Sequence, residues 1–545
     1  MIDIPEGSSR VGPLNPERRI DLTVVLAQKT LLPGPHPATQ ASGDARTFPA
    51  QYMTHAQLKD AHGAAPGSAE LIQAFAKRHR LTVVEVAVHR RSIRLSGKSA
   101  DVERAFKIHL EEFDHKGNRF FAPSGPIEVP DEWQGVALAV LGLHNSRHSQ
   151  PRRRSSLCSL EPSAKVTELA AAYRFPKDLD GTGQTIGLIE LEGGFYLEDI
   201  EEFCSRLGIR LPRISVVKLG NSDNRPASHR ATHELMEVLN GSLSMAAGAP
   251  ESDTLIPAQC TAEVTMDLEI LAALAPAAHI VVYFAPNDGQ GLYHALSHAA
   301  HDQTHKPDVL SISWSFPEHT VSKEEIDSLE GVLCEAAHLG ITVCASSGDD
   351  GAMNGSKHGS PSVNYPASSA HCLACGGTSG KITSTEVDNE VVWNAKHFGI
   401  HGATGGGVSV RFHVPAWQQH AQVPAAPNRK PGRGIPDVAG LADPRYGCEL
   451  LMSGRVFASA GTSAVAPMWA ALIARVNQAL GLRCGHIHPH LYTLGREGHA
   501  GLRRIHEGNN GYYHAGAGWN ACTGYGTPHG DALLAYLKSA LKDRK

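Results

Sequence analysis

Short apolar runs alternate with stretches of helical periodicity along the C-terminal part of the chain. Four of these runs have the length and composition of buried strands: Thr185–Leu191, Ile280–Phe284, Val309–Trp314 and Ile341–Ala345. Helical periodicity marks Thr261–Leu274 and Lys323–Leu339, which lie between them. Strands that lack a polar face and are separated by helices are typical of a parallel sheet covered on both faces. We therefore expect an α/β domain with its functional site at the carboxyl ends of the strands.

Residues 50–145 show a different pattern, which predicts a smaller α/β domain. Its expected helices lie near 56–60, 69–80, 100–108 and 134–143, with strands at 81–88 and 92–95 and a hairpin through 114–118. The polar, basic stretch 145–156 has no periodicity, which predicts an exposed linker; a processing site and a merely solvated connection explain it equally well. We divide the chain into an N-terminal domain (1–145), a linker (146–162) and a C-terminal domain (163–545).

The overall composition argues against several classes of function. A net charge of −5 shows no basic excess, so we expect no nucleic-acid partner. We find no apolar run of 18 or more residues, so we expect no membrane span, and Met1–Gly7 lacks the regions of an ordinary signal peptide. Cys372 and Cys375 lie in an apolar run, which favours core cysteines over a zinc site.

Histidine is unusually frequent in this chain. If all 31 histidines were protonated while the carboxylates stayed ionised, the net charge would move from −5 to +26. Acidification would therefore change the electrostatics of the protein greatly, as a pH-triggered event requires. A source rich in histidine codons explains the same count equally well.

The segment Ser459–Leu472 is the sharpest local feature of the sequence. Its small residues and Gly461 allow a tight turn into a helix, which would leave Ser463 near the helix N-terminus. Backbone N–H groups there favour developing negative charge, so Ser463 is a candidate nucleophile. An ordinary N-capping turn is the alternative. The His-dependent subtilisin arrangement is not found, because the strand that would carry its Asp presents Glu190 and the only suitable His-Gly pair, at His401, lies in a Gly-rich loop.

Two carboxyl groups lie four residues apart in the helix expected over Thr261–Leu274. Glu263 and Asp267 would share one face, close enough for one carboxylate to accept the serine proton and for its neighbour to share it at low pH. Asp349 follows the strand Ile341–Ala345, and a protonated carboxylic acid at this edge could donate a hydrogen bond to an oxyanion. A solvated acidic face and a Gly-Asp-Asp-Gly turn are the simpler explanations of these two features taken singly.

Taken in order, Glu-x-x-x-Asp, Ser-Gly-Asp-x-Gly and Gly-Thr-Ser-x-x-x-Pro resemble the motifs of the sedolisin family of serine-carboxyl peptidases, and most closely its kumamolisin-like members. The similarity also includes five further segments: Val281–Asn287, His305–Trp314, Thr404–Ser409, Arg433–Val438 and Ala515–Trp519. It extends over nearly the whole chain. Residues 50–145 resemble the activation domain of the family.

The resemblance implies a subtilisin-like catalytic domain behind a small ferredoxin-like prodomain. It assigns Ser463, Glu263 and Asp267 to a catalytic triad and Asp349 to the oxyanion hole, with Glu190 and Trp314 extending the proton network. A packing role is the alternative for Trp314. The implied protein is a self-processing precursor of an acid-acting, extracellular endopeptidase. It would be a monomer that cleaves proteins or peptides and is inhibited by its own N-terminal domain.

The resemblance also implies a calcium ion near the C-terminus, but the matching loop departs from the family pattern. Arg504 and Asn520 stand where the family has acidic ligands, beside Ile505, Gly516 and Gly518. Calcium prefers anionic oxygen ligands, so we expect no calcium here and consider that the arginine supplies the positive charge internally. A second departure is the long segment Asn221–Pro257, which we expect to form a surface loop.

Two other classes of function remain to be weighed. A catalytically inactive relative that binds peptides would be expected to lack a residue of the site, but Ser463, Glu263, Asp267 and Asp349 are all present. A histidine-rich metal-binding or structural protein would need histidines at ligand spacing, whereas they are scattered from His36 to His529.

Overall fold

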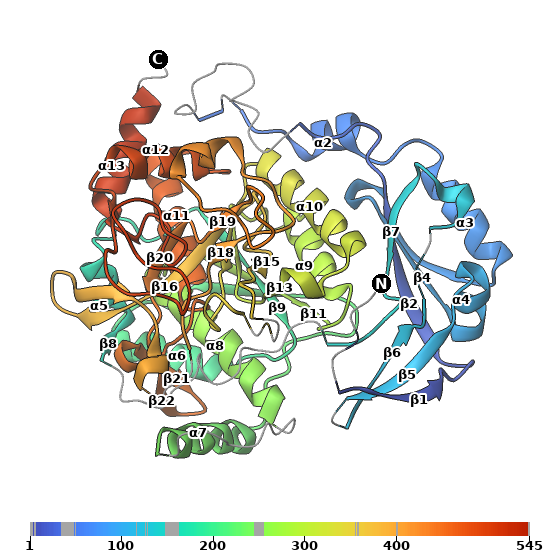
Figure 1. Cartoon of the computed structure of the whole chain (residues 1–545), viewed down its shortest axis with the longest axis horizontal. Helices are drawn as coiled ribbons and strands as arrows, with labels where there is room; N and C mark the ends of the chain where they lie inside the picture. Colours follow the sequence, from blue (N-terminus) through green and yellow to red (C-terminus); the bar gives the residue numbers. More distant parts are fainter. Residues whose placement is uncertain are drawn as a thin grey trace.

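The N-terminal and C-terminal parts of the chain form two units that pack side by side (Figure 1). The computed structural model describes residues 7–33, 48–49, 51–115, 117–125, 129–147, 163–244, 255–354, 359–398 and 402–542, together with residues 4, 127 and 356. Most of the expected linker, residues 148–162, lies outside the described residues, and so does His401.

The N-terminal domain is built on an antiparallel sheet in the order β3-β4-β2-β7. Its strands are β2 (Arg19–Leu26), β3 (Thr82–Ala87), β4 (Ser92–Lys98) and β7 (Ala137–Leu141), and its helices are α2 (His55–His62), α3 (Ser68–Arg78) and α4 (Ser99–Phe106). This chain order and sheet order are those of a ferredoxin-like fold, as expected. A second sheet joins β1 (Ser9–Pro13), β5 (Leu110–His115) and β6 (Asn118–Pro123).

Three expectations about elements were wrong. The helix expected near 134–143 is the strand β7, because the short apolar run Ala137–Leu141 pairs with β2 and has no periodicity that would separate strand from helix. The folded unit begins well before residue 50, since β2 lies inside the sheet between β4 and β7. The surface loop expected over Asn221–Pro257 contains a helix, α7 (His229–Ser244).

The C-terminal domain is built on a mostly parallel sheet in the order β10-β11-β9-β12-β14-β16-β17, with β20 beside β16. Its strands are β9 (Thr185–Leu191), β10 (Arg213–Lys218), β11 (His279–Ala285), β12 (Val309–Ile312), β14 (Thr342–Ser346), β16 (Cys372–Ile382), β17 (Val387–Val392) and β20 (Val438–Leu441). The four expected strands are confirmed, and Cys372 and Cys375 are buried in β16. Only β17 runs antiparallel to its neighbour among the described strands of this sheet.

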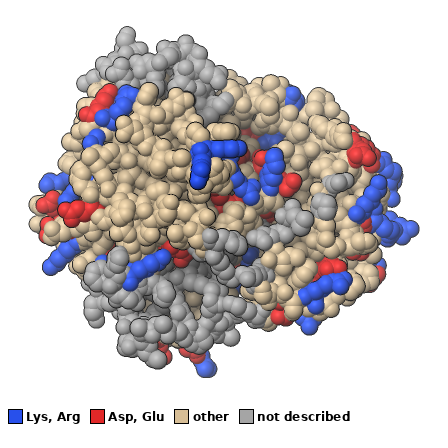
Figure 2. Space-filling model, in the orientation of Figure 1, with Lys and Arg blue, Asp and Glu red and all other residues tan. Residues whose placement is uncertain are grey.

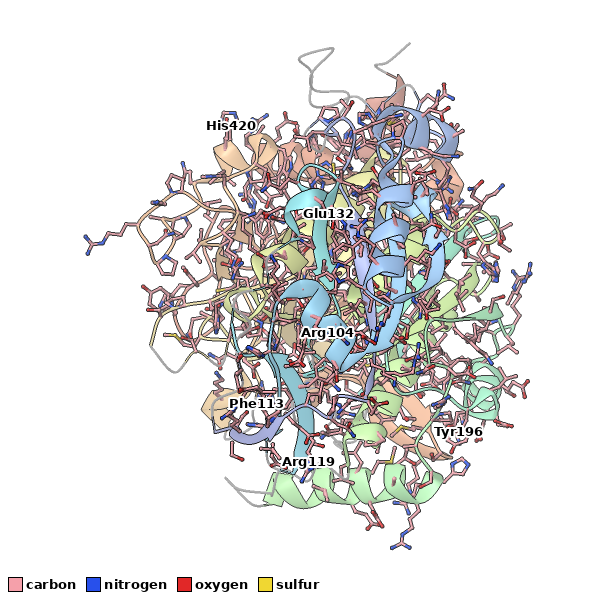
Figure 3. The ribbon with its side chains drawn as sticks, turned by 90° about the vertical axis from the view of Figure 1, so that its right-hand side faces the viewer. Arg104, Phe113, Arg119, Glu132, Tyr196 and His420 are labelled. Carbon is pink, nitrogen blue, oxygen red and sulfur yellow. The ribbon has the colours of Figure 1, made fainter. Side chains whose placement is uncertain are left out.

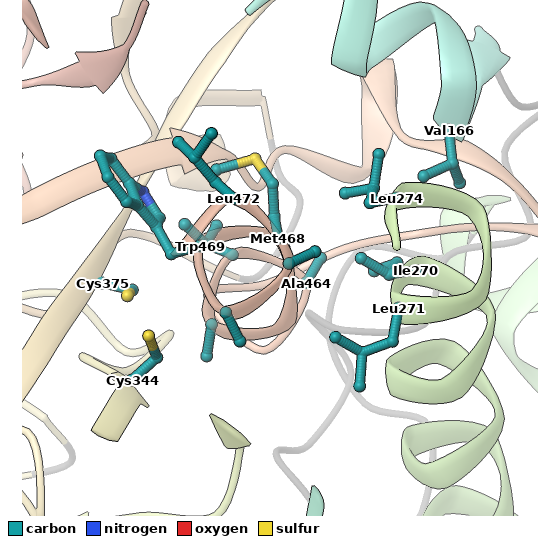
Figure 4. Packing of buried hydrophobic residues seen from close by; sticks show 14 of the residues in the cluster. Val166, Ile270, Leu271, Leu274, Cys344, Cys375, Ala464, Met468, Trp469 and Leu472 are labelled. Carbon is teal, nitrogen blue, oxygen red and sulfur yellow. The ribbon is translucent and has the colours of Figure 1, made fainter. Parts of the chain in front are cut away.

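Helices cover both faces of this sheet, because each strand buries residues of both parities. One face packs against α8 (Ile256–Leu274) and α11 (Val465–Leu480), and the other against α9 (Gly291–Ala300) and α10 (Lys323–His338). Figure 4 shows α8 and α11 in contact, with Ile270 and Leu274 facing Ala464 and Met468. This contact holds α8, which carries Glu263 and Asp267, against α11, which directly follows Ser463.

The N-terminal domain docks on the α9 and α10 side of the large sheet (Figure 1). Val25, Ala139 and Leu141 from its own sheet belong to the apolar cluster that contains Leu292 and Leu329 of these two helices. Looking onto this domain, Figure 3 shows Glu132, Arg104, Phe113 and Arg119 along it, with Tyr196 and His420 of the C-terminal domain farther out. The two domains therefore share a continuous apolar interface.

Candidate active site

Ser463 lies in a tight turn that leads into α11. Gly461 has a φ of 78°, a left-handed conformation that glycine adopts without strain, and the amide of Val465 donates to the carbonyl of Thr462. Pro467 falls within the first turn of α11, where amide groups have no helical acceptor. Ser463 is therefore held just before the helix N-terminus, as the sequence predicted, and it is almost fully buried.

The helix α8 brings Glu263 and Asp267 into the interior of the domain. Every residue of α8 from Cys260 to Leu274 is buried, so these acids do not belong to a solvated face. Glu190, on β9, points to the same side of the sheet, and its carboxyl group interacts with that of Glu263. The site thus contains three neighbouring carboxyl groups on two elements.

Burial and mutual repulsion change the ionisation of this group. Burial raises the pKa of Asp267 well above its ordinary value, and the charges of Glu190 and Glu263 raise it further. Burial also raises the pKa of Glu190, with a further contribution from Glu263. Glu190 and Asp267 therefore retain protons under conditions in which isolated carboxyl groups have lost them.

Ser313 and Trp314, which follow β12, connect these acids to the rest of the site. The Ser313 Oγ atom lies 2.6 Å from Asp267 Oδ2 and 3.2 Å from the carbonyl oxygen of Ser463. The indole Nε1 of Trp314 donates to Glu190 Oε2 over 2.8 Å. Sequence reasoning missed Ser313, although its signal was present as a serine at the carboxyl end of a buried strand.

Asp349 follows β14 and is fully buried beside the Ser463 turn. Its Oδ1 atom accepts hydrogen bonds from the amide and the hydroxyl group of Thr462, each 2.8 Å long. The Thr462 hydroxyl oxygen in turn accepts a bond from the amide of Gly348, 2.9 Å away. Asp349 and the residue before Ser463 are therefore held together, and Thr462 is a second residue that sequence reasoning missed.

The C-terminal loop does not offer a calcium ion the expected ligands. The guanidinium group of Arg504 donates to the carbonyls of Ala517 and Gly495, each over 2.7 Å. The side-chain oxygen of Asn520 accepts hydrogen bonds from Cys522 N and from Thr523 N and Oγ1. Ile505 is buried, whereas Gly516 and Gly518 have open space around them. Within the described residues, no group of three or more His, Cys, Asp or Glu side chains is placed to hold a metal ion.

The end of the N-terminal domain reaches the carboxyl edge of the large sheet. Arg147, at the start of the expected linker and the last described residue before residues 148–162, lies 3.1 Å from the carboxyl group of Glu192. Glu192 is two residues beyond Glu190, at the end of β9. The chain that leaves the N-terminal domain therefore starts close to the acid cluster.

The surface agrees with the composition. Figure 2 shows basic and acidic side chains interspersed on the described residues of the visible face. Of the described helices, none is long and apolar enough to cross a membrane.

Comparisons with known proteins agree with this architecture. Residues 6–146 match the family described as Pro-kumamolisin, activation domain. Kumamolisin from Bacillus sp. (strain MN-32) is 37% identical over 97% of this chain and 94% of its own length. Sedolisin from Pseudomonas sp. (strain 101) is 26% identical over 87% of this chain and 80% of its own.

A solved structure of Pseudomonas sedolisin, a serine-carboxyl proteinase complexed with two molecules of pseudo-iodotyrostatin, superposes with a TM-score of 0.58. It is 25% identical and covers 70% of this chain and 99% of its own. Fold, site and relatives together define the class of protein as a serine-carboxyl peptidase made with an activation domain. The chain belongs to the sedolisin family.

Proposed function

We propose that Ser463, Glu263 and Asp267 form the catalytic triad of this peptidase and that Asp349 completes its oxyanion hole. One observation carries the proposal: the hydroxyl group of Ser313 lies within hydrogen-bond distance of both Asp267 and the main chain of Ser463. The acid-bearing helix α8 and the turn that carries the serine therefore meet at one point of the sheet edge.

The proposed reaction begins with proton transfer from Ser463 to Glu263. As Ser463 Oγ bonds to the carbonyl carbon of the substrate, its proton passes to the Glu263 carboxylate, and Asp267 shares that proton. Glu263 then protonates the amine nitrogen as the carbon–nitrogen bond breaks, leaving an acyl-enzyme that water hydrolyses by the same steps. The proposed hydrogen bond between Ser463 and Glu263 would tighten when substrate binds, as catalytic hydrogen bonds commonly do.

Asp349 would act as an acid that donates to the oxyanion. Its Oδ1 atom accepts two hydrogen bonds from Thr462, so the acid proton belongs on Oδ2. In this form Oδ2 can donate to the oxygen that becomes negative in the transition state. An ionised Asp349 could not, so we expect activity to require acidic conditions. Glu190 and Trp314 would extend the proton network behind Asp267.

The test compares Ser463→Ala and Glu263→Gln with Glu269→Gln. Glu269 is a matched control because it lies on the same buried helix, but its carboxyl group accepts from the amide of Leu451, away from the serine. We expect kcat/KM at about pH 4 to fall by about a thousandfold or more in the first two variants, and to stay within about threefold in the control. Undiminished cleavage by Ser463→Ala would overturn the proposed site.

We also propose that this peptidase folds and works without calcium. The Arg504 guanidinium group already binds two backbone carbonyls, one of them in the last turn of α12 (His488–Glu497), where positive charge is favourable. The Asn520 side-chain oxygen already has three donors. The loop is thus closed by a cation of the chain itself.

The activation domain is proposed as an intramolecular inhibitor that acid releases. It contacts α9 and α10, and Arg147, at the start of the linker that follows it, lies next to Glu192 beside the acid cluster. Cleavage within the predicted linker, residues 146–162, would separate a domain of residues 1–145 from a catalytic domain of residues 163–545. The mature enzyme is proposed as a monomeric extracellular endopeptidase that acts on proteins or peptides.

A further inference from the structure

The Ser313 hydroxyl group faces two acceptors with one hydrogen. Its oxygen lies 2.6 Å from Asp267 Oδ2 and 3.2 Å from the Ser463 carbonyl oxygen, and the side chain is buried. A hydroxyl group carries a single proton, so it can donate fully to only one of these oxygens at a time. Which of the two oxygens accepts this hydrogen bond depends on whether Asp267 is protonated.

The carbonyl of Ser463 needs a donor from outside its own helix. In a regular helix, this carbonyl would accept from the amide of the residue four positions further on. That residue is Pro467, which has no N–H group. The two amides that could otherwise turn back, those of Val465 and Ala466, both donate to Thr462. Ser313 therefore supplies the donor that the Gly-Thr-Ser-x-x-x-Pro sequence removes.

The main chain of Ser313 is fixed, so that its hydroxyl group can change partner by rotation alone. The hydroxyl group of Ser346 donates to the Ser313 carbonyl oxygen over 3.1 Å. The next residue, Trp314, donates to Glu190. Reorienting a hydroxyl hydrogen needs no displacement of heavy atoms.

We infer that Ser313 is a positioning residue that couples the protonation state of Asp267 to the main chain of Ser463. When Asp267 is ionised, the Ser313 hydroxyl donates to Oδ2. When Oδ2 carries a proton, it donates to Ser313 Oγ, and the Ser313 hydrogen turns to the Ser463 carbonyl. The nucleophile is then anchored to the sheet in the acid form of the site. The inference rests on the proposed function.

The electrostatics of Asp267 support this arrangement. Burial and the charges of Glu190 and Glu263 raise the pKa of Asp267, while the hydrogen bond from Ser313 lowers it. Removing the Ser313 hydroxyl therefore raises this pKa further. The part of the kcat–pH profile that depends on the titration of Asp267 should therefore move toward higher pH.

The experiment compares Ser313→Ala, Ser313→Thr and Ser311→Ala in the activated enzyme. Ser311 lies two residues earlier on the same side of β12, is equally buried, and its hydroxyl makes no hydrogen bond to another described residue. We expect Ser313→Ala to lower kcat by about tenfold to a hundredfold with KM nearly unchanged, and to shift the kcat profile upward by about half a pH unit or more. Ser313→Thr should restore both, and Ser311→Ala should change neither.

Thermal unfolding confirms that each variant is folded; if Ser313→Ala is not, Ser313→Cys takes its place as a side chain of similar size with a weaker donor. An unchanged kcat profile in the folded variant, or equal losses in Ser313→Ala and Ser311→Ala, would overturn the inference. Ser463→Ala is measured alongside. Activity in that variant would refute the proposed function, whereas an inactive Ser463→Ala with an unaffected Ser313→Ala would refute only the role of Ser313.

Discussion

At the scale of single residues, Arg504 closes the C-terminal loop with its guanidinium group. Its two hydrogen bonds to carbonyl oxygens tie the loop at Ala517 to the end of α12 at Gly495. A calcium ion would have to displace this guanidinium group and then find anionic oxygens, which Asn520 does not provide. The positive charge is covalently part of the chain, so chelators cannot remove it.

We expect that EGTA leaves the melting temperature unchanged and that Arg504→Ala lowers it by about 2–5 °C, because two carbonyls lose their donor. The neighbouring Arg496→Ala is the matched control. The Arg496 side chain is about half exposed, and its ion pair with Glu497 is long, at 4.0 Å. Differential scanning calorimetry with and without calcium measures both effects. If EGTA lowered the melting temperature and added calcium restored it, other oxygens of the loop would be shown to bind the metal.

A double variant that restores two acidic side chains to this loop tests the same proposal in the opposite direction. Arg504→Asp combined with Asn520→Asp should make the melting temperature depend on added calcium, because it restores two carboxylates to the loop.

The sequence located individual site residues better than it located their contacts. Glu263, Asp267, Asp349 and Ser463 could be singled out because spacing on a helix, strand ends and a tight turn are local properties. The contact between Ser313 and Asp267 joins two elements far apart in the chain, and only the packing of α8 against the sheet determines it. The roles assigned to all of these residues stay predictions.

At the scale of elements, the helix α9 places two histidines beneath the activation domain. The hydroxyl group of Thr23, on β2, lies 2.9 Å from His294 Nε2. Burial lowers the pKa of His294 to about 3, with contributions from the charges of His298, Arg94 and Arg90. Burial and Arg90 lower the pKa of His298 to about 4, with Glu85 acting in the opposite direction.

These lowered pKa values determine how the docking responds to pH. A histidine whose pKa is lowered in the docked state is protonated more readily when the domains are apart. Docking therefore loses stability as the pH falls from about 6.5, the ordinary value, toward 4 and 3. A histidine pKa that is lower by one in the docked state than in the separated state costs docking about 1.4 kcal/mol in acid. Protonation would also place these histidines against Arg90 and Arg94, whose charges Glu85 neutralises only in part.

We predict that His294→Gln combined with His298→Gln shifts the midpoint of acid release downward by about one pH unit or more. Release is measured by size-exclusion chromatography on precursor that carries Ser463→Ala and has been nicked in the linker. The exposed His420, which Figure 3 places away from the activation domain, provides the control His420→Gln. An unchanged midpoint in the double variant would exclude these histidines as the trigger.

Sequence patterns also predicted most of these elements. Buried strands such as β9 and β11 are continuous apolar runs, so their boundaries were close to those observed. The five apolar residues of β7 do not reveal a period, so the sequence alone does not separate a strand from a helix there, and only the pairing with β2 shows that they form a strand. Nothing in the sequence indicates that α9 lies under β2, so the interface histidines could not be identified.

At the scale of the whole molecule, a buried ion pair opposes the histidines. Arg91 of the activation domain lies 2.7 Å from Glu335 on α10, which also binds His301 over 2.9 Å. Burial alone would raise the pKa of Glu335, but Arg91 and His301 outweigh it and lower the pKa to about 2. A carboxyl group with a lowered pKa stabilises docking above its ordinary pKa and stops doing so only as the pH falls through about 2. This pair therefore persists at pH 4.

We predict that the nicked Ser463→Ala precursor stays associated at neutral pH and separates at about pH 4. The histidines then outweigh the ion pair, and uncut precursor at the same pH stays tethered by its linker. Size-exclusion chromatography of nicked and uncut protein at both pH values measures this. Separation at neutral pH, or tight association at pH 4, would leave the activation domain as a folding aid only.

If acid releases the activation domain as proposed, the apolar interface between the two domains would make activation a one-way process. Once released, the activation domain exposes Val25, Ala139 and Leu141, and Arg91 has lost Glu335. Such a fragment has less buried surface to hold it folded, and unfolded chains are what a peptidase digests most readily. The enzyme would thus destroy its own inhibitor, and a later return to neutral pH could not restore latency. A brief exposure to acid would then leave the enzyme active permanently.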